Sequence, residues 1–183
     1  NPSGKLPFSF PAKLTDCGAH AFDELSYPGD SIKQEYKEDI LVGYRWHDTK
    51  KIPALFPFGH GLSYTTFTYG KPVASAKTMA ADGTLTVTVA VKNTGSIAGK
   101  EIVQLYVGDD KCSVLRPVKE LKHFAKVALA PGEEKSVTFT LTPDDLKFYD
   151  EASAAWKYES GKFKAYVCAS SADVRGVVSF EMQ

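Results

Sequence analysis

From Tyr64 to Gln183, apolar and polar residues alternate in short runs. In the first clear run, residues 85–91, every second residue is Leu or Val, and Thr or Ala lies between them. Similar runs follow at 101–107, 127–129, 137–141, 161–169 and 176–182. A period of two places successive side chains on opposite faces of a strand. Six or more such strands separated by turn residues predict an all-β fold, an antiparallel two-sheet sandwich, over residues 64–183.

The connections between these runs contain ordinary turn residues. Ala130-Pro131-Gly132-Glu133 predicts a turn, and Thr142-Pro143-Asp144-Asp145-Leu146 predicts one helical turn capped by Thr142. Residues 95–100 (GSIAGK) superficially resemble a phosphate-binding loop, but the segment is one residue too short and Glu101 follows the Lys. We therefore expect a hairpin turn there, and no long helix anywhere.

Residues 1–63 have a different character. They contain six of the ten prolines, which lock φ and lack an N–H, so the segment predicts an extended arm with turns. Within it, Tyr36–Trp46 is expected to form a strand, because Ile40-Leu41-Val42 is continuously apolar. The arm supplies no obvious neighbours for that strand. Its free edge therefore suggests a homo-oligomer formed through the N-terminal arm.

Charge and cysteine content exclude several classes of function. The 22 basic residues balance the 22 acidic ones, so nothing draws the chain to nucleic acid or to an anionic membrane. No apolar run is long enough to cross a bilayer. Three cysteines, Cys17, Cys112 and Cys168, form neither a disulfide framework nor a CxxC site, and Cys168 is expected to be a small buried hydrophobe. The four histidines lack metal-ligand spacing, and no cofactor is expected.

Residues 36–67 read YKEDILVGYRWHDTKKIPALFPFGHGLSYTTF. This segment resembles the C-terminal region of glycoside hydrolase family 3, the β-glucosidases and related enzymes. Those enzymes typically show Tyr-x-Glu, then Val-Gly-Tyr-Arg, an aromatic residue and an Asp, and finally Phe-Pro-Phe-Gly-x-Gly-Leu-Ser-Tyr-Thr-x-Phe. The opening GKLPFSFP at 4–11 is also similar to the family. Residues 91–107, 116–121 and 130–133 are similar to its fibronectin type III-like domain.

The resemblance implies an immunoglobulin/fibronectin type III-like sandwich at 64–183. Residues 1–63 would be an arm and the remnant of a preceding α/β sandwich domain. The family's Asp nucleophile and acid/base Glu precede the segment seen here, so this chain is expected to be inactive alone and to pack against the catalytic domains of a parent enzyme. The parent would carry out retaining hydrolysis of terminal β-linked sugars, binding carbohydrate only when intact. The family resemblance also suggests a periplasmic or extracellular location.

Retaining glycoside hydrolysis needs two carboxyl groups about 5 to 5.5 Å apart across the scissile bond. The carboxylate pairs 109–110, 133–134, 144–145 and 150–151 are adjacent in sequence and fall at predicted turns, where they are expected to be solvated. No catalytic residue is therefore assigned. His47-Asp48 could be half of a triad, but no Gly-x-Ser-x-Gly elbow supplies a nucleophile.

Four residues of the matched motif are candidates for lining the substrate in the intact parent, with a structural role as the alternative: Glu38, Arg45, Trp46 and Asp48. The turn at 56–61 (FPFGHG), with glycines that permit positive φ, is expected to anchor the arm against the sandwich. Trp156 and Tyr158 could stack on sugar rings, which leaves a carbohydrate-binding module as an alternative function. A protein interaction module is the third hypothesis.

Overall fold

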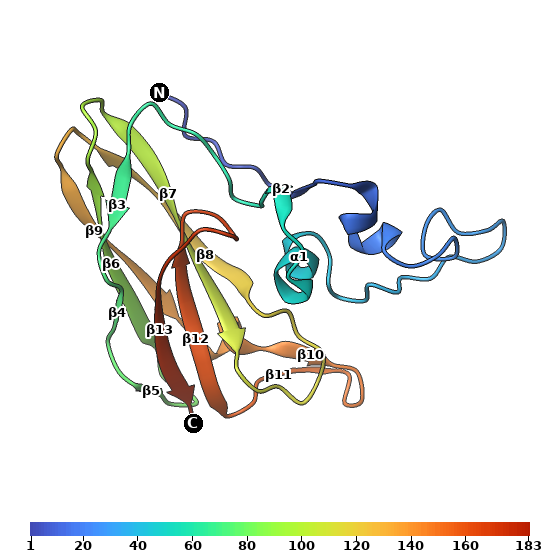
Figure 1. Cartoon of the computed structure of the whole chain (residues 1–183). Helices are drawn as coiled ribbons and strands as arrows, with labels where there is room; N and C mark the ends of the chain where they lie inside the picture. The colour runs from blue at the N-terminus through green and yellow to red at the C-terminus, as the bar shows by residue number, and fades with distance from the viewer.

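The computed structural model describes residues 1–183 and contains two β-sheets packed face to face (Figure 1). The larger sheet has the strand order β5-β13-β12-β7-β8. Its strands are β5 (Thr78–Met79), β7 (Gly99–Asp109), β8 (Glu120–Leu129), β12 (Gly161–Cys168) and β13 (Val174–Met182). All its pairings are antiparallel except the short β5–β13 pair. The predicted antiparallel sandwich is confirmed.

The smaller sheet is organised around β6 (Leu85–Asn93). β9 (Glu134–Leu141) pairs along one side of β6, and the short strands β3 (Phe67–Tyr69) and β4 (Val73–Ala74) pair along the other. The alternation read from the sequence fixes which side chains face inward. Leu85, Val87, Val89 and Val91 are all at most 1% exposed, while the residues between them are half-buried.

The core lies between the two sheets. It joins the inward faces of β6, β7, β9, β12 and β13 in one cluster of 18 buried side chains. Phe163 and Phe180 stack across the β12–β13 pair with ring centroids 5.8 Å apart. The cluster takes side chains from residue 79 to residue 182, so its burial holds the two sheets together.

Two predicted connections are confirmed. Glu133 N donates to the Ala130 carbonyl, with Gly132 at φ 76°, and α2 (Pro143–Leu146) is a single turn that begins after Thr142. The expected hairpin at 95–100 is wrong. β6 and β7 belong to different sheets, so this segment crosses from one sheet to the other. Alternating strands look alike in sequence whether or not they pair with each other.

The arm runs along one edge of the sandwich and then projects away from it (Figure 1). Its regular elements are β1 (Phe10–Pro11), the 3-10 helices η1 (Leu14–Asp16) and η2 (Gly18–His20), α1 (Tyr44–Lys50) and β2 (Ala54–Phe56). β1 pairs with β2. The prediction of extended chain with turns missed the three short helices.

The strand expected at Tyr36–Trp46 does not form, and that prediction is wrong. Asp39 and Gly43 adopt left-handed backbone conformations, with φ 57° and 61°, on either side of Ile40-Leu41-Val42. Turn hydrogen bonds from Asp39 N to Tyr36 O and from Leu41 N to Glu38 O satisfy the backbone locally. Of the three apolar residues Ile40, Leu41 and Val42, only Leu41 is buried, at 2% exposure. A strand buried on both faces needs neighbouring strands, and none is present. The free strand edge that suggested an arm-mediated oligomer is therefore absent.

A second two-stranded ribbon, β10 (Phe148–Asp150) with β11 (Ala155–Lys157), extends from the end of the sandwich opposite the N-terminus (Figure 1). None of the helices combines the length and the apolar character that crossing a bilayer requires.

Candidate functional site

Helix α1 carries Tyr44, Arg45, Trp46 and Asp48 of the family motif and is bonded to the sandwich by one face. Its residues 44, 45, 48 and 49 share that face because they are spaced by one helical turn. All four contact residues 118–121, at the start of β8. Tyr44 Oη accepts from Leu121 N at 2.8 Å, Arg45 lies 3.5 Å from Glu120, Asp48 lies 2.6 Å from Lys119, and Thr49 Oγ1 accepts from Val118 N at 3.1 Å.

The Asp48–Lys119 ion pair is the buried centre of this contact. The side chains are 12% and 8% exposed, and Lys119 Nζ also lies 5.7 Å from the centre of the Tyr106 ring. Burial raises the pKa of Asp48, and the hydrogen bond from Lys119 acts in the opposite direction. The Asp48 carboxylate therefore binds a cation of its own chain, Lys119.

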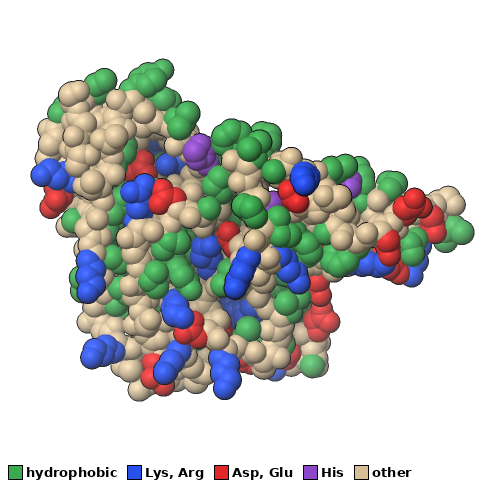
Figure 2. Space-filling model, viewed as in Figure 1, with side chains coloured by type: hydrophobic (Ala, Val, Ile, Leu, Met, Phe, Trp, Pro, Cys, Tyr) green, Lys and Arg blue, Asp and Glu red, His purple; other side chains and the backbone are tan.

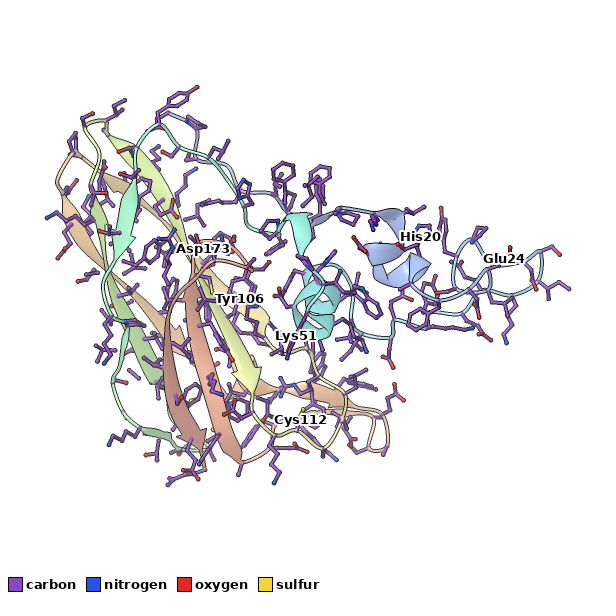
Figure 3. The ribbon with its side chains drawn as sticks, viewed as in Figure 1. His20, Glu24, Lys51, Tyr106, Cys112 and Asp173 are labelled. Carbon is purple, nitrogen blue, oxygen red and sulfur yellow. The ribbon has the colours of Figure 1, made fainter.

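Beneath the arm, β7 is buried on both faces. Its inward residues belong to the core, and its outward residues Gln104 and Tyr106 are 3% and 0% exposed because the arm covers them. Gln104 Nε2 donates to the carbonyls of Gly59 and Ala169 at 3.1 and 2.8 Å, and Tyr106 Oη donates to Gln104 Oε1 at 2.6 Å. In Figure 3, Tyr106 lies between the larger sheet and α1. The turn at 56–61 thus anchors the arm, as predicted.

Trp46 and Glu38 pack inside the arm. Trp46 is 6% exposed, its indole N–H donates to the Asp16 carbonyl at 3.1 Å, and Phe22 meets its ring edge-on. Glu38 is 9% exposed, and its Oε2 atom is buried without a hydrogen-bond partner. A Cβ at Gly18 would lie only 3.0 Å from the Glu38 Cβ and 3.3 Å from the Trp46 ring, so only glycine fits between them.

Two carboxylates converge outside the arm, at Arg116. Its guanidinium lies 3.4 Å from Asp109 and 3.4 Å from Glu120, and it packs over the ring of Phe148. The Asp109 side chain is 3% exposed, which corrects the expectation that the 109–110 pair is solvated. Both carboxylates are thus bound to a cation of the same chain, which suits a structural ion network.

A hollow beside α1 is lined by Ser9, His47, Asp48 and Ser171, the residue types of a hydrolytic triad. Their hydrogen bonds do not connect them into such a triad. His47 Nδ1 lies 3.0 Å from the Ile52 carbonyl, and the Asp48 carboxylate binds Lys119. A triad requires the base to bond both the nucleophile and the acid, so this group has no relay.

A second hollow lies where the arm crosses β7. The Glu101 carboxylate there accepts from Lys5 of the arm at 3.3 Å and from Tyr69 of β3 at 2.8 Å. Burial, and then the adjacent carboxylate, raise the pKa of Tyr69. Asp173, labelled in Figure 3, pairs with Arg175 on the same rim. Each charge in this hollow thus has a partner within the chain.

The two aromatic candidates on the sandwich differ in accessibility. Trp156 is 66% exposed and meets Tyr149 edge-on, with ring centroids 5.7 Å apart. Tyr158 is half-buried and packs against the core. Only Trp156 therefore presents a ring face to solvent. No group of three or more His, Cys, Asp or Glu side chains is close enough to hold a metal ion.

Sequence reasoning missed Lys119, Gln104 and Tyr44, which hold the arm in place. Gln104 and Tyr106 occupy the outward positions of β7, but both residue types are also ordinary on a solvated strand face, so the sequence did not mark them as buried. No local pattern pointed to Lys119.

Comparison with known proteins matches residues 101–171 to the fibronectin type III-like domain family. The β-glucosidase BoGH3A of Bacteroides ovatus is 68% identical over 180 residues, which cover 98% of this chain and 24% of that protein. The thermostable β-glucosidase B of Acetivibrio thermocellus is 51% identical over 174 residues, which cover 95% of this chain and 22% of that protein. The chain thus spans about a quarter of the length of these relatives.

Solved structures agree over the whole chain. DesR, a β-glucosidase from Streptomyces venezuelae determined with D-glucose, superposes with a TM-score of 0.89 at 41% identity, covering 100% of this chain and 23% of that one. The GH3 β-glucosidase of Bifidobacterium adolescentis superposes with a TM-score of 0.89 at 36% identity, covering 99% of this chain and 26% of that one. The chain is thus homologous to the C-terminal region of the β-glucosidases of glycoside hydrolase family 3, and it contains a fibronectin type III-like domain.

Proposed function

We propose that this chain is a non-catalytic region that packs against and stabilises the catalytic domains of a family 3 β-glucosidase-like enzyme. The supporting observation is the distribution of exposed apolar side chains. Of the 23 large hydrophobic residues that are exposed, 12 lie within the 63 residues of the arm and 11 within the remaining 120. Single exposed apolar residues are normal, but a concentration of them marks an interaction surface.

This surface follows the projecting arm. Figure 2 shows hydrophobic side chains along the part of the molecule that extends away from the sandwich. The most exposed of them are Ile32 at 94%, Tyr36 at 74%, Leu14 at 65% and Val42 at 63%. Leu62 and Tyr64, both 74% exposed, lie instead beside the sandwich near the N-terminus. Hydrogen bonds of α1 and Gln104 fix the arm to the sandwich, so the surface would be presented in one shape before docking, which lowers the entropy cost of association.

The division of the chain that fits this role is an arm, residues 1–63, that completes a preceding domain, and a sandwich, residues 64–183, that supports it. The contacts of Arg45 and Asp48 with Glu120 and Lys119 favour a structural role for both over substrate lining. Burial of Trp46 favours the same role.

The proposed activity of the parent is retaining hydrolysis of terminal β-linked sugars. Its relatives are named as β-glucosidases, and the two carboxyl groups that this reaction needs would lie in the catalytic domains. Purified 183-residue chain mixed with aryl-β-glycosides is expected to release no aryl alcohol above the buffer rate. Hydrolysis at the rate of an ordinary enzyme would reject the non-catalytic role.

The docking role has a separate test. Covalent surface labelling of the 183-residue chain and of the parent-length polypeptide would compare Ile32, Tyr36 and Val42 with Trp156. We expect labelling of the first three to fall severalfold in the parent-length polypeptide, while labelling of Trp156 stays constant. Equal labelling of the arm in both proteins would contradict docking through the arm.

A second candidate function, carbohydrate binding, is favoured by one observation: the exposed ring of Trp156 beside Tyr149. Calorimetry of the 183-residue chain against a panel of β-glucans distinguishes the two functions. A pure packing role predicts no heat. Heat that disappears in Trp156→Ala would establish the binding function.

A further inference from the structure

The arm contains one buried carboxylate without a partner. The other buried charged or amide side chains that face the arm are bonded: Glu101 to Lys5 and Tyr69, Lys119 to Asp48, and Gln104 to two carbonyls. Glu38 is 9% exposed, and its Oε2 atom receives no hydrogen bond. Buried carboxylates in proteins are almost always paired with a cation or hydrogen-bonded, so this one needs an explanation.

The position of Glu38 is set by its neighbours. Its Cβ packs against the backbone of Gly18 at the start of η2, where the ring of Trp46 from α1 closes the same space. Gly18, Trp46 and Glu38 thus form one packed unit that holds the carboxylate in place. The lysines of the chain beside this unit are engaged elsewhere, Lys37 with Asp23 and Glu35, and Lys50 over the ring of Trp46. The 9% of Glu38 that stays exposed is therefore open to a donor from outside the 183 residues.

Three exposed apolar side chains belong to the segments that build this unit, together with Lys50, whose Nζ lies 5.4 Å from the centre of the Trp46 ring. Phe22, Ile40 and Val42 are exposed at 47%, 43% and 63%. A partner that covers these side chains would remove water from Glu38 completely. Leaving the carboxylate unpaired under such a cover would be very unfavourable, so the covering surface must carry a compensating cation.

We propose that Glu38 forms a buried ion pair with an Arg or Lys side chain from the catalytic part of the same polypeptide, within a contact to which Phe22, Ile40 and Val42 contribute apolar area. This inference rests on the proposed function, since it names the chemistry of that docking surface. The occupant is the remainder of the parent polypeptide, because relatives of this chain are about four times its length. Glu38 would then specify the register of docking, while Ile40 and Val42 supply the buried area.

The test compares two variants in two proteins. Glu38→Gln keeps the shape of the side chain but removes its charge, and Glu38→Leu removes all hydrogen bonding. Glu24→Gln is the matched control, because Glu24 is exposed, makes no ion pair and lies on the outer loop of the same arm (Figure 3). The readout is hydrogen exchange of the backbone amides of residues 38–46, which reports how often this segment opens.

In the parent-length polypeptide, both Glu38 variants are expected to exchange at least about tenfold faster than wild type, because an unpaired cation is left buried. In the 183-residue chain, the same variants should leave exchange unchanged or slow it, and the Tm should stay constant or rise by roughly 2 to 4 °C, because an unpaired acid has been removed. Glu24→Gln should change neither the exchange rate nor the Tm in either protein.

Faster exchange in the parent-length polypeptide, without faster exchange in the 183-residue chain, is the decisive result. If Glu38→Gln leaves exchange of the parent-length polypeptide at the wild-type rate, or speeds it equally in both proteins, the ion pair is wrong. The docking role would still stand if the amides of residues 32–42 exchange more slowly in the wild-type parent-length polypeptide than in the 183-residue chain. Equal exchange of these amides in the two wild-type proteins would reject the docking role itself.

Discussion

Lys119 Nζ lies 2.6 Å from Asp48 Oδ2, across 71 residues of sequence, and both side chains are almost completely buried. This pair joins helix α1 of the arm to the beginning of β8. Lys119→Met is expected to lower the free energy of unfolding by about 3 kcal/mol, because it leaves the Asp48 carboxylate buried without a cation. The midpoint of urea unfolding of the 183-residue chain measures the change.

Two further variants separate the ion pair from general surface effects. Lys111→Met removes an exposed lysine that makes no ion pair, and it should shift the midpoint by less than about 0.5 kcal/mol. The double variant Asp48→Asn with Lys119→Met should recover most of the loss, because both charges are then absent. If Lys119→Met were as mild as Lys111→Met, the pair would not stabilise the arm.

The turn at Gly59 allows backbone and steric effects to be measured separately. Gly59 has φ 78°, and a Cβ there would lie 2.8 Å from Gln104 Cδ, whose amide is fixed by three hydrogen bonds. Gly132 has φ 76°, with nothing within 4 Å of such a Cβ. Gly132→Ala should therefore cost about 1 kcal/mol from backbone strain alone.

Gly59→Ala should cost roughly 2 to 4 kcal/mol, since the methyl group also displaces the Gln104 amide from buried carbonyls. Chemical denaturation of both variants, measured side by side, gives the difference. Equal losses would show that the arm is free to move away from β7 at this point. Such a result would weaken the account of the arm as a preformed docking surface.

The parts of the fold that were predictable depend on local information. Alternation along 85–91 or 137–141 records which face of a strand is buried, and the structure follows it residue by residue. The error at Ile40-Leu41-Val42 has the same origin. A continuous apolar run indicates burial on both faces, but it carries no information about whether neighbouring strands exist.

The contacts of the arm could not be predicted for a related reason. The Asp48–Lys119 and Lys5–Glu101 pairs join residues 71 and 96 positions apart, and nothing near Lys119 or Glu101 in sequence marks it as a partner. The motif resemblance drew attention to Glu38, Arg45, Trp46 and Asp48 as a group. The structure divides them: α1 directs Arg45 and Asp48 toward β8, whereas Trp46 and Glu38 pack with Gly18 inside the arm.

The three thiols are expected to differ in reactivity. Cys168 is 0% exposed, and burial raises its pKa to about 12, whereas Cys17 and Cys112 are half-buried. Because the thiolate is the reactive species, Cys168 should resist alkylation at pH 8. Mass spectrometry after iodoacetamide treatment should find two modified cysteines in the native chain and three in urea. Modification of Cys168 in the native chain would show that β12 opens readily.

The β10–β11 ribbon should lose stability in acid through a single carboxylate. Hydrogen bonds from Lys157 and Ser153 lower the pKa of Asp150 from 3.8 to about 2. A group whose pKa is lower in the folded state binds protons more weakly when folded, so its contribution is complete above pH 4 and disappears as the pH falls toward 2. Asp150→Asn should therefore lower the Tm at pH 6, with the difference from wild type vanishing near pH 2.

Exposed Asp144, which binds only Lys147, provides the control: Asp144→Asn should produce a smaller difference at pH 6. A wild-type minus Asp150→Asn difference that stayed constant from pH 6 to pH 2 would mean that the ribbon is not held by this carboxylate.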